Sequence, residues 1–203
     1  MAIMLTDPRL EQQLKAEREA SGADRYDEVW EGIYMMTPLP NNEHQEIVTR
    51  LACILQEVVG WPGLGDVCAG VNLSDRDVDW EHNYRVPDVA VFLRTGRAEN
   101  LGTHWRGAAD LLVEVLSPDD RTRDKLDFYS RLGVRELLLV DRGPWALELY
   151  RGGSSGLQPV ESADARAGEV RSAVLPLTFR LVAAGGRPDI EVTHVDSSRA
   201  WRV

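Results

Sequence analysis

The sequence is poor in the residues that build disulfide and zinc sites. Its 203 residues include two cysteines, Cys53 and Cys68, and four histidines, and the cysteines have neither CxxC spacing nor a histidine cluster nearby. A disulfide framework or a structural zinc site needs more thiol or imidazole groups at close spacing. We therefore exclude both kinds of site and expect the two cysteines to be small buried residues.

Long apolar runs are also absent. No stretch approaches the ~20 apolar residues that a membrane-spanning helix requires. The N-terminal stretch MAIMLTDPRLEQQLKAERE becomes charged before a signal-peptide core could form. These features predict a cytoplasmic protein that does not contact a membrane.

Basic residues are outnumbered by acidic ones. The chain has 23 Lys and Arg against 33 Asp and Glu, which gives a net charge of −10 at pH 7. Residues 1–84 hold 16 acidic and 6 basic side chains, whereas residues 85–151 and 152–203 are each balanced. Tight nonspecific binding of nucleic acid usually needs a basic surface, because neutralising phosphates releases counterions. The composition therefore argues against such binding by this chain alone.

The chain length and an apolar content of 43% fit one domain over residues 1–203 with a sizeable core. Residues 10–20 have helical composition, and residues 27–38 alternate around Glu31-Gly32, which predicts a hairpin. The clearest helix is predicted over residues 41–60. Its apolar residues recur every three or four positions and should pack on a sheet; they are Ile47, Leu51, Ile54 and Val58.

The remaining patterns predict a mixed sheet. Residues 86–93 and 111–116 are nearly continuous apolar runs, as expected of strands that are covered on both faces. A helix is predicted next, followed by two strands joined at Gly143-Pro144 and two shorter strands in the tail; these elements cover residues 119–133, 134–141, 145–151, 172–182 and 189–195. This order indicates an α/β domain with a mixed central β-sheet flanked by helices.

Each of the two apolar strands carries one carboxylate, Asp88 in VPDVAVFL and Glu114 in LLVEVL. Consecutive strands are often neighbours, so the two carboxylates can converge within a few ångströms. Two such anions need a cation between them, or one of them must be protonated. A hard divalent ion such as Mg²⁺ or Mn²⁺ prefers carboxylate oxygens and meets that need. Alternatively, each acid pairs separately with an arginine, such as Arg85 or Arg121.

Lys125 follows on the next predicted helix. Tyr129 and Leu132 stand four and seven residues after it, so we expect this face of the helix to meet the sheet. A lysine beside two carboxylates and a metal can orient a water and stabilise charge on a phosphate oxygen. The alternative is a solvated helix lysine paired with Asp120 or Asp124.

The segment 75–79 has the Asp-x-Asp-x-Asp rhythm of a calcium loop, but Trp80 stands where the turn glycine belongs. We interpret this segment as an acidic loop rather than a calcium site.

Several stretches of the sequence resemble a known family. RVPDVAVF, followed by LLVEVLSPDDRTRDKLDFYSRLGVRELLLVD, resembles the core of the bacterial "putative restriction endonuclease" family of the PD-(D/E)XK nuclease superfamily. YDEVWEGIYMMTPLPNNEHQEIVTRL resembles its N-terminal hairpin and first core helix, so the likeness spans about residues 25–182. The resemblance implies a restriction endonuclease-like core, with an N-terminal helix and a C-terminal strand extension around it.

The resemblance also implies roles for site residues. Asp88 and Glu114 would be the metal-binding acids, with the Val115 carbonyl as a further ligand. The superfamily's lysine usually stands two residues after the second acid, where this chain has Leu116. The resemblance therefore gives the lysine's role to Lys125 on the neighbouring helix.

The first core helix often adds one acidic or polar group to such sites. Glu43, His44 and Glu46 occupy that region here. His44 looks most like the family pattern, and Glu43 is the second auxiliary candidate.

Together these features predict a Mg²⁺- or Mn²⁺-dependent endonuclease that hydrolyses phosphodiester bonds of nucleic acid, with DNA as the expected substrate, acting alone or as a homodimer. The rival hypothesis is a catalytically silent interaction or regulatory module that keeps the nuclease fold, which the acidic first 84 residues favour. A third hypothesis, a plain metal-binding protein, would use the same acids without Lys125.

Overall fold

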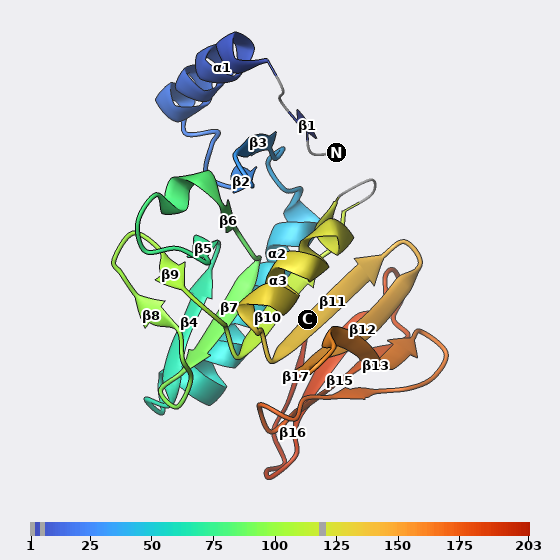
Figure 1. Ribbon diagram of the computed structural model, residues 1–203. Coiled ribbons are helices and arrows are strands. Elements are labelled where there is room, and N and C mark those ends of the chain that lie inside the picture. Colours follow the sequence, from blue (N-terminus) through green and yellow to red (C-terminus); the bar gives the residue numbers. More distant parts are fainter. Residues whose placement is uncertain (1–2, 5–6, 118–120) are drawn as a thin grey trace.

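The computed structural model describes residues 3–4, 7–117 and 121–203 (Figure 1). Its helical segments are α1 (Pro8–Ser21), α2 (Asn42–Leu55) with a π-helical turn (Gln56–Gly60), a 3₁₀ turn (Trp80–His82), and α3 (Leu126–Leu132) with a preceding 3₁₀ turn (Thr122–Lys125). The described part of the chain also forms three β-sheets. The predicted α/β class is confirmed.

The central sheet carries the two strands that were predicted to bear carboxylates. In spatial order its strands are β13 (Gly156–Asp164), β12 (Trp145–Gly153), β11 (Glu136–Arg142), β10 (Leu111–Val115), β7 (Val89–Leu93) and β4 (Gly65–Ala69). β10 and β11 are parallel, whereas the other neighbouring pairs are antiparallel. The sheet is therefore mixed, as the sequence predicted, and β4 forms one of its edges.

Two helices cover opposite faces of this sheet (Figure 1). The apolar stripe of α2 packs in the same buried cluster as Val89 and Val113. Leu112, which points the other way along β10, packs with Phe128 and Tyr129 of α3. Both strands are covered on both faces, and this explains their nearly continuous apolar sequence.

A second, N-terminal sheet holds the predicted hairpin. Its strands, in spatial order, are β1 (Ile3–Met4), β3 (Ile33–Met36), β2 (Glu28–Trp30), β6 (Tyr84–Arg85), β5 (Leu73–Ser74), β9 (Trp105–Arg106) and β8 (Glu99–Asn100). β2 and β3 are joined by Glu31 and Gly32, whose φ angles of 49° and 84° are those of a tight hairpin turn. The hairpin prediction is confirmed.

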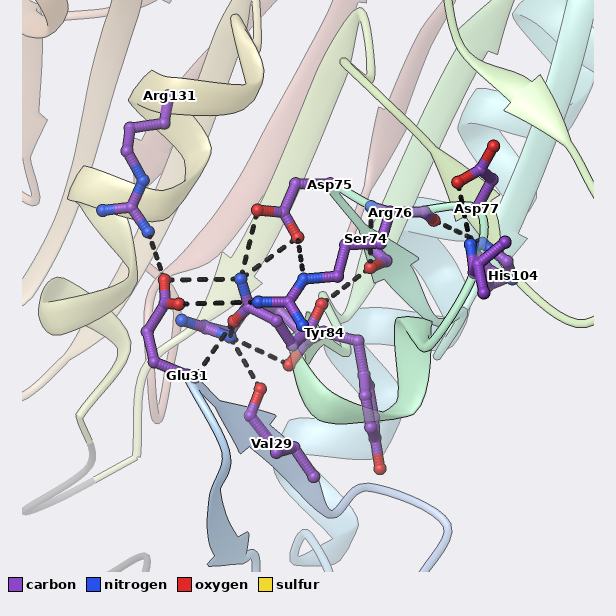
Figure 2. Close-up of polar contacts among 12 residues, drawn as sticks. Val29, Glu31, Ser74, Asp75, Arg76, Asp77, Tyr84, His104 and Arg131 are labelled. Carbon is purple, nitrogen blue, oxygen red and sulfur yellow. Dashed lines mark hydrogen bonds and ion pairs between the residues drawn. The ribbon is translucent and has the colours of Figure 1, made fainter.

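Polar contacts tie this hairpin to the rest of the protein. Glu31 accepts hydrogen bonds from Arg131 of α3 at 2.8 Å and from Asn83 at 3.3 Å (Figure 2). Asn83 also donates to Asp75 in the segment 75–79, and Asp77 of that segment pairs with Arg106. The carboxylates of Asp75 and Asp77 are therefore occupied by protein partners, as expected of an acidic loop.

A third sheet packs on the same face of the central sheet as α2, because its apolar residues belong to the same buried cluster. Its strands are β14 (Val170–Arg171), β15 (Leu177–Val182), β16 (Asp189–His194) and β17 (Ala200–Arg202). Helix α1 is attached at the opposite end, where Arg18 bonds Asp27 just before β2. No helix in the described ranges is long and apolar enough to cross a membrane.

The expectation that both cysteines are buried is wrong. Cys53 is exposed and Cys68 is only partly buried. Cys53 lies between the apolar positions of α2, on the side of the helix that turns away from the core.

Candidate active site

Asp88 and Glu114 lie beside each other at the end of the central sheet. Val113 of β10 faces Val89 of β7 in the antiparallel register, so Glu114 and Asp88 stand opposite each other one residue further on. Both line one cavity of about 260 Å³. The Glu114 side chain is 4% exposed and the Asp88 side chain 16%. The register of β7 and β10 thus brings the two carboxylates together, as the sequence predicted.

Asp88 is held from two sides. The backbone N–H of Val115 donates to Asp88 Oδ2 at 2.7 Å, and His44 Nε2 lies 2.9 Å from Asp88 Oδ1. His44 is in the first turn of α2, where Asn41 caps the helix by accepting from the His44 N–H. Helix α2, which covers one face of the sheet, therefore supports Asp88 at the strand end through His44.

Glu114 accepts two hydrogen bonds on one oxygen. Lys125 Nζ donates to Glu114 Oε1 at 3.1 Å, and the Tyr129 hydroxyl donates to the same atom at 2.6 Å. Burial raises the pKa of Glu114 to about 8, against the lowering effect of Lys125, and the negative charges of Asp88 and Glu28 raise it further. A second positive charge near Glu114 would favour its ionised form.

Lys125 stands between two carboxylates. Its ammonium is 2.8 Å from Glu28 Oε1 and 3.1 Å from Glu114 Oε1, and its side chain is 11% exposed. Burial alone would lower the pKa of Lys125, but Glu114 and Glu28 outweigh that effect and raise it, so the lysine is charged. The alternative of a solvated surface lysine is wrong, and Asp124 instead pairs with Arg121 at 2.7 Å.

The alternative in which each acid pairs with its own arginine is also wrong. Arg121 pairs with Asp124, as above. Arg85 is 3% exposed and donates to the backbone carbonyls of Val29 at 2.9 Å and Tyr84 at 3.0 Å. Its guanidinium also lies over the rings of Phe128 and Trp30. Arg85 thus fills the space beneath the hairpin and pairs with neither acid.

Glu28 was missed by the sequence argument. It lies on β2 and is 3% exposed, and its carboxylate accepts from the Val86 N–H at 2.8 Å and from Trp30 Nε1 at 2.6 Å. The signal was available, because Glu28 is a single carboxylate in a short buried strand, just as Glu114 is.

Of the three candidates on α2, only His44 lines the cavity that holds Asp88 and Glu114. Glu43 instead pairs with Arg142 at 2.9 Å, and Glu46 pairs with Arg50 at 2.8 Å. The structure therefore brings Asp88, Glu114, Lys125 and His44 together with Glu28, and it turns Glu43 toward an arginine.

Arg142 hydrogen-bonds the residues that follow β10, next to the site. It donates to the Leu116 carbonyl at 2.9 Å and to Ser117 Oγ at 3.0 Å, directly after β10. The same guanidinium bonds Glu43 at the start of α2. One buried cation therefore links β11, the end of β10 and the helix that supplies His44.

The donor set at this cavity fits a hard cation. Mg²⁺ typically binds one or two carboxylates and keeps several waters, and Asp88 and Glu114 supply two carboxylates while Val115 also lines the cavity. The described lining also holds a third acid, Glu28, and two cations, the buried Lys125 and the partly exposed Arg121. Within the described ranges, no three His, Cys, Asp or Glu side chains are grouped to hold a metal.

A mixed sheet with helices on both faces and two acids at neighbouring strand ends is the arrangement expected of a restriction endonuclease-like core. A family model described as "Uma2: Putative restriction endonuclease" matches residues 10–184. The chain therefore belongs to this family, as its sequence motifs predicted. The match begins within α1 and ends just after β15.

A solved structure supports the same fold. The chain is similar to the crystal structure of a putative nuclease belonging to DUF820 from Anabaena variabilis, with a TM-score of 0.58 and 20% identity. The similarity covers 72% of this chain and 80% of that one. Comparison with curated proteins found no match.

Proposed function

We propose that the protein is a Mg²⁺- or Mn²⁺-dependent endonuclease that hydrolyses phosphodiester bonds of nucleic acid, with DNA as the expected substrate. The observation that carries this proposal is the pair of adjacent carboxylates, Asp88 and Glu114, with the charged Lys125 buried beside them. Membership of the putative restriction endonuclease family supports the same reaction class.

Asp88 and Glu114, with the Val115 carbonyl, would hold the cation. When bound, the metal ion would polarise the scissile phosphate and lower the pKa of a water molecule. His44 and the Val115 N–H fix the orientation of Asp88, and the Tyr129 hydroxyl fixes that of Glu114. These contacts keep the ligands in place before substrate arrives, which lowers the cost of organising the site.

Lys125 supplies the positive charge for the reacting phosphate. Its ammonium can donate three hydrogen bonds, and the structure gives it two carboxylate partners, Glu28 and Glu114. The remaining N–H can hold the attacking water or stabilise the charge that develops on a phosphate oxygen. Glu28 contributes by holding the lysine charged and pointed at the cavity.

The test is a cleavage assay on single-stranded and double-stranded DNA and RNA with Mg²⁺, with Mn²⁺ and with EDTA. Wild type is compared with Asp88→Asn, which keeps the shape of the side chain and removes its charge. Glu46→Gln is the matched control, because Glu46 lies on α2 outside the cavity and pairs only with Arg50 among its described contacts.

Cleavage that needs both the metal and Asp88, and that Glu46→Gln retains, supports the enzyme. Silence of the wild type on every substrate would favour the catalytically silent module instead. Cleavage by Asp88→Asn at the wild-type rate would contradict the proposed site.

A further inference from the structure

A second cavity of about 360 Å³ adjoins the acid site. It lies between α2 and the edge strand β4, which are neighbours in Figure 1. Tyr26 and Asp88 line both this cavity and the one that holds Glu114 and Lys125. Anything bound in the second cavity therefore lies next to the acid pair.

The chemistry of this second cavity differs from that of the first. Asp88 is the one charged side chain among the described residues that line it. The rest of the lining is apolar, amide, hydroxyl or thiol, and includes Val48, Thr49, Cys53, Gln45 and Gln56. A phosphate would need cations, so this lining does not suit the nucleic-acid backbone. It suits a flat, neutral group with hydrogen-bonding edges.

Trp61 stands at the wall of this cavity. The residue is 73% exposed, the largest fraction among the large apolar residues in the described ranges. Its backbone is fixed, because the Trp61 N–H donates to the Gln56 carbonyl at 2.8 Å at the end of the π-helical turn. An exposed indole on a fixed backbone is the kind of surface on which nucleic-acid bases stack.

We infer that this cavity binds an unpaired nucleobase of the substrate, stacked on Trp61, while the neighbouring phosphate lies at Asp88 and Lys125. A base inside a duplex is stacked and paired, so only single-stranded or locally opened nucleic acid can place a base there. The inference rests on the proposed nuclease function and narrows its substrate class. The amides of Gln45 and Gln56 would contact the base edge.

The test measures binding rather than cleavage. Fluorescently labelled octathymidylate and an abasic strand of equal length and charge are titrated with protein in EDTA, at one fixed low salt concentration, by fluorescence anisotropy. Base stacking is worth ~1–3 kcal/mol per base, so wild type should prefer the thymidine strand by about tenfold. Trp61→Ala should lose most of this preference, and Trp61→Phe should keep it.

Leu64→Ala is the matched control, because Leu64 is 56% exposed and lies three residues beyond Trp61, outside the cavity lining. The inference is overturned if wild type does not distinguish the two strands, or if Trp61→Ala distinguishes them as well as wild type. It is also overturned if wild type forms a dimer that Trp61→Ala dissociates, since the surface would then join two copies of the chain. Because EDTA prevents metal-dependent cleavage, failure of the proposed nuclease function would not by itself change these results.

Discussion

The ammonium of Lys125 lies 2.8 Å from the carboxylate of Glu28, so the N-terminal hairpin reaches into a site whose other acids come from the central sheet. Lys125 also bonds Glu114, which places one charged lysine between acids from two different sheets. The hairpin is therefore part of the site as well as a cover for it.

Replacing Lys125 with methionine should nearly abolish cleavage and leave metal binding largely intact. The substitution removes the charge that stabilises the transition state and keeps both proposed ligands, so turnover should fall by about 10²–10³-fold. The measurement is the single-turnover cleavage rate beside a Mn²⁺ titration. Arg50→Ala is the control, because Arg50 is an exposed cation of α2 that pairs with Glu46 outside the cavity. A wild-type rate for Lys125→Met would show that the lysine has no catalytic role.

The same lysine also has a predictable effect on stability. Removing it leaves the Glu28 carboxylate buried without a cation, whereas Glu114, whose pKa is about 8, stays protonated near neutral pH. Removing one partner of a buried ion pair costs ~3–5 kcal/mol. Adding Glu28→Gln to Lys125→Met should recover part of this loss, because one uncompensated charge disappears. Urea unfolding of the single and double variants measures the recovery. The double variant should still fail to cleave.

Substitutions of the adjacent residues Glu43 and His44 should have very different effects on metal affinity. His44 bonds Asp88, so His44→Ala should weaken metal binding by about 10- to 100-fold, the usual effect of losing a group that orients a ligand. Glu43 pairs with Arg142 outside the cavity, so Glu43→Gln should leave metal affinity nearly unchanged. Calorimetric Mn²⁺ titrations of the two variants make the comparison. Equal losses would mean that α2 acts through its position alone.

Without metal, Glu114 should make the protein less stable as pH rises. Burial raises the pKa of Glu114 from 4.5 to about 8 in the folded state. Between those values the unfolded chain releases a proton that the folded chain keeps, so the contribution of Glu114 is present below pH 4.5 and lost through about pH 8. Glu114→Gln cannot titrate there, so its unfolding free energy relative to wild type should rise from pH 5 to pH 8.5 in EDTA. A constant difference would contradict the raised pKa.

Divalent metal should reverse this pH trend. It binds the ionised carboxylates, so Mg²⁺ or Mn²⁺ should raise the melting temperature of the wild type more at pH 7.5 than at pH 5. Asp110→Asn is a useful control, because Asp110 is a buried acid paired with Arg135 away from the cavity. Its metal-induced shift should match that of the wild type.

The sequence predicted the sheet and the acid pair because both depend on short-range patterns. Alternation along two apolar strands placed Asp88 and Glu114 on one face, and the helical spacing to Tyr129 turned Lys125 toward the sheet. Both placements agree with the structure. The predicted helix over residues 119–133 is described from residue 121, as a 3₁₀ turn and α3, and residues 118–120 lie outside the described residues.

Local sequence patterns could not predict contacts between residues that are far apart in the sequence. Glu28 meets Lys125 because β2 pairs with β6, which leads directly into the strand of Asp88. The sequence carries no local sign of that pairing. Arg142 likewise bonds Glu43 across 99 positions, and this contact turns Glu43 away from the cavity.

The most direct test of the central claim is Mn²⁺ binding to wild type, Asp88→Asn and Glu114→Gln at pH 7.5, followed by electron paramagnetic resonance. If Asp88 and Glu114 together hold the metal, wild type should bind one ion per chain at this site and each variant should lose it. Unchanged Mn²⁺ binding in both variants would contradict the claim.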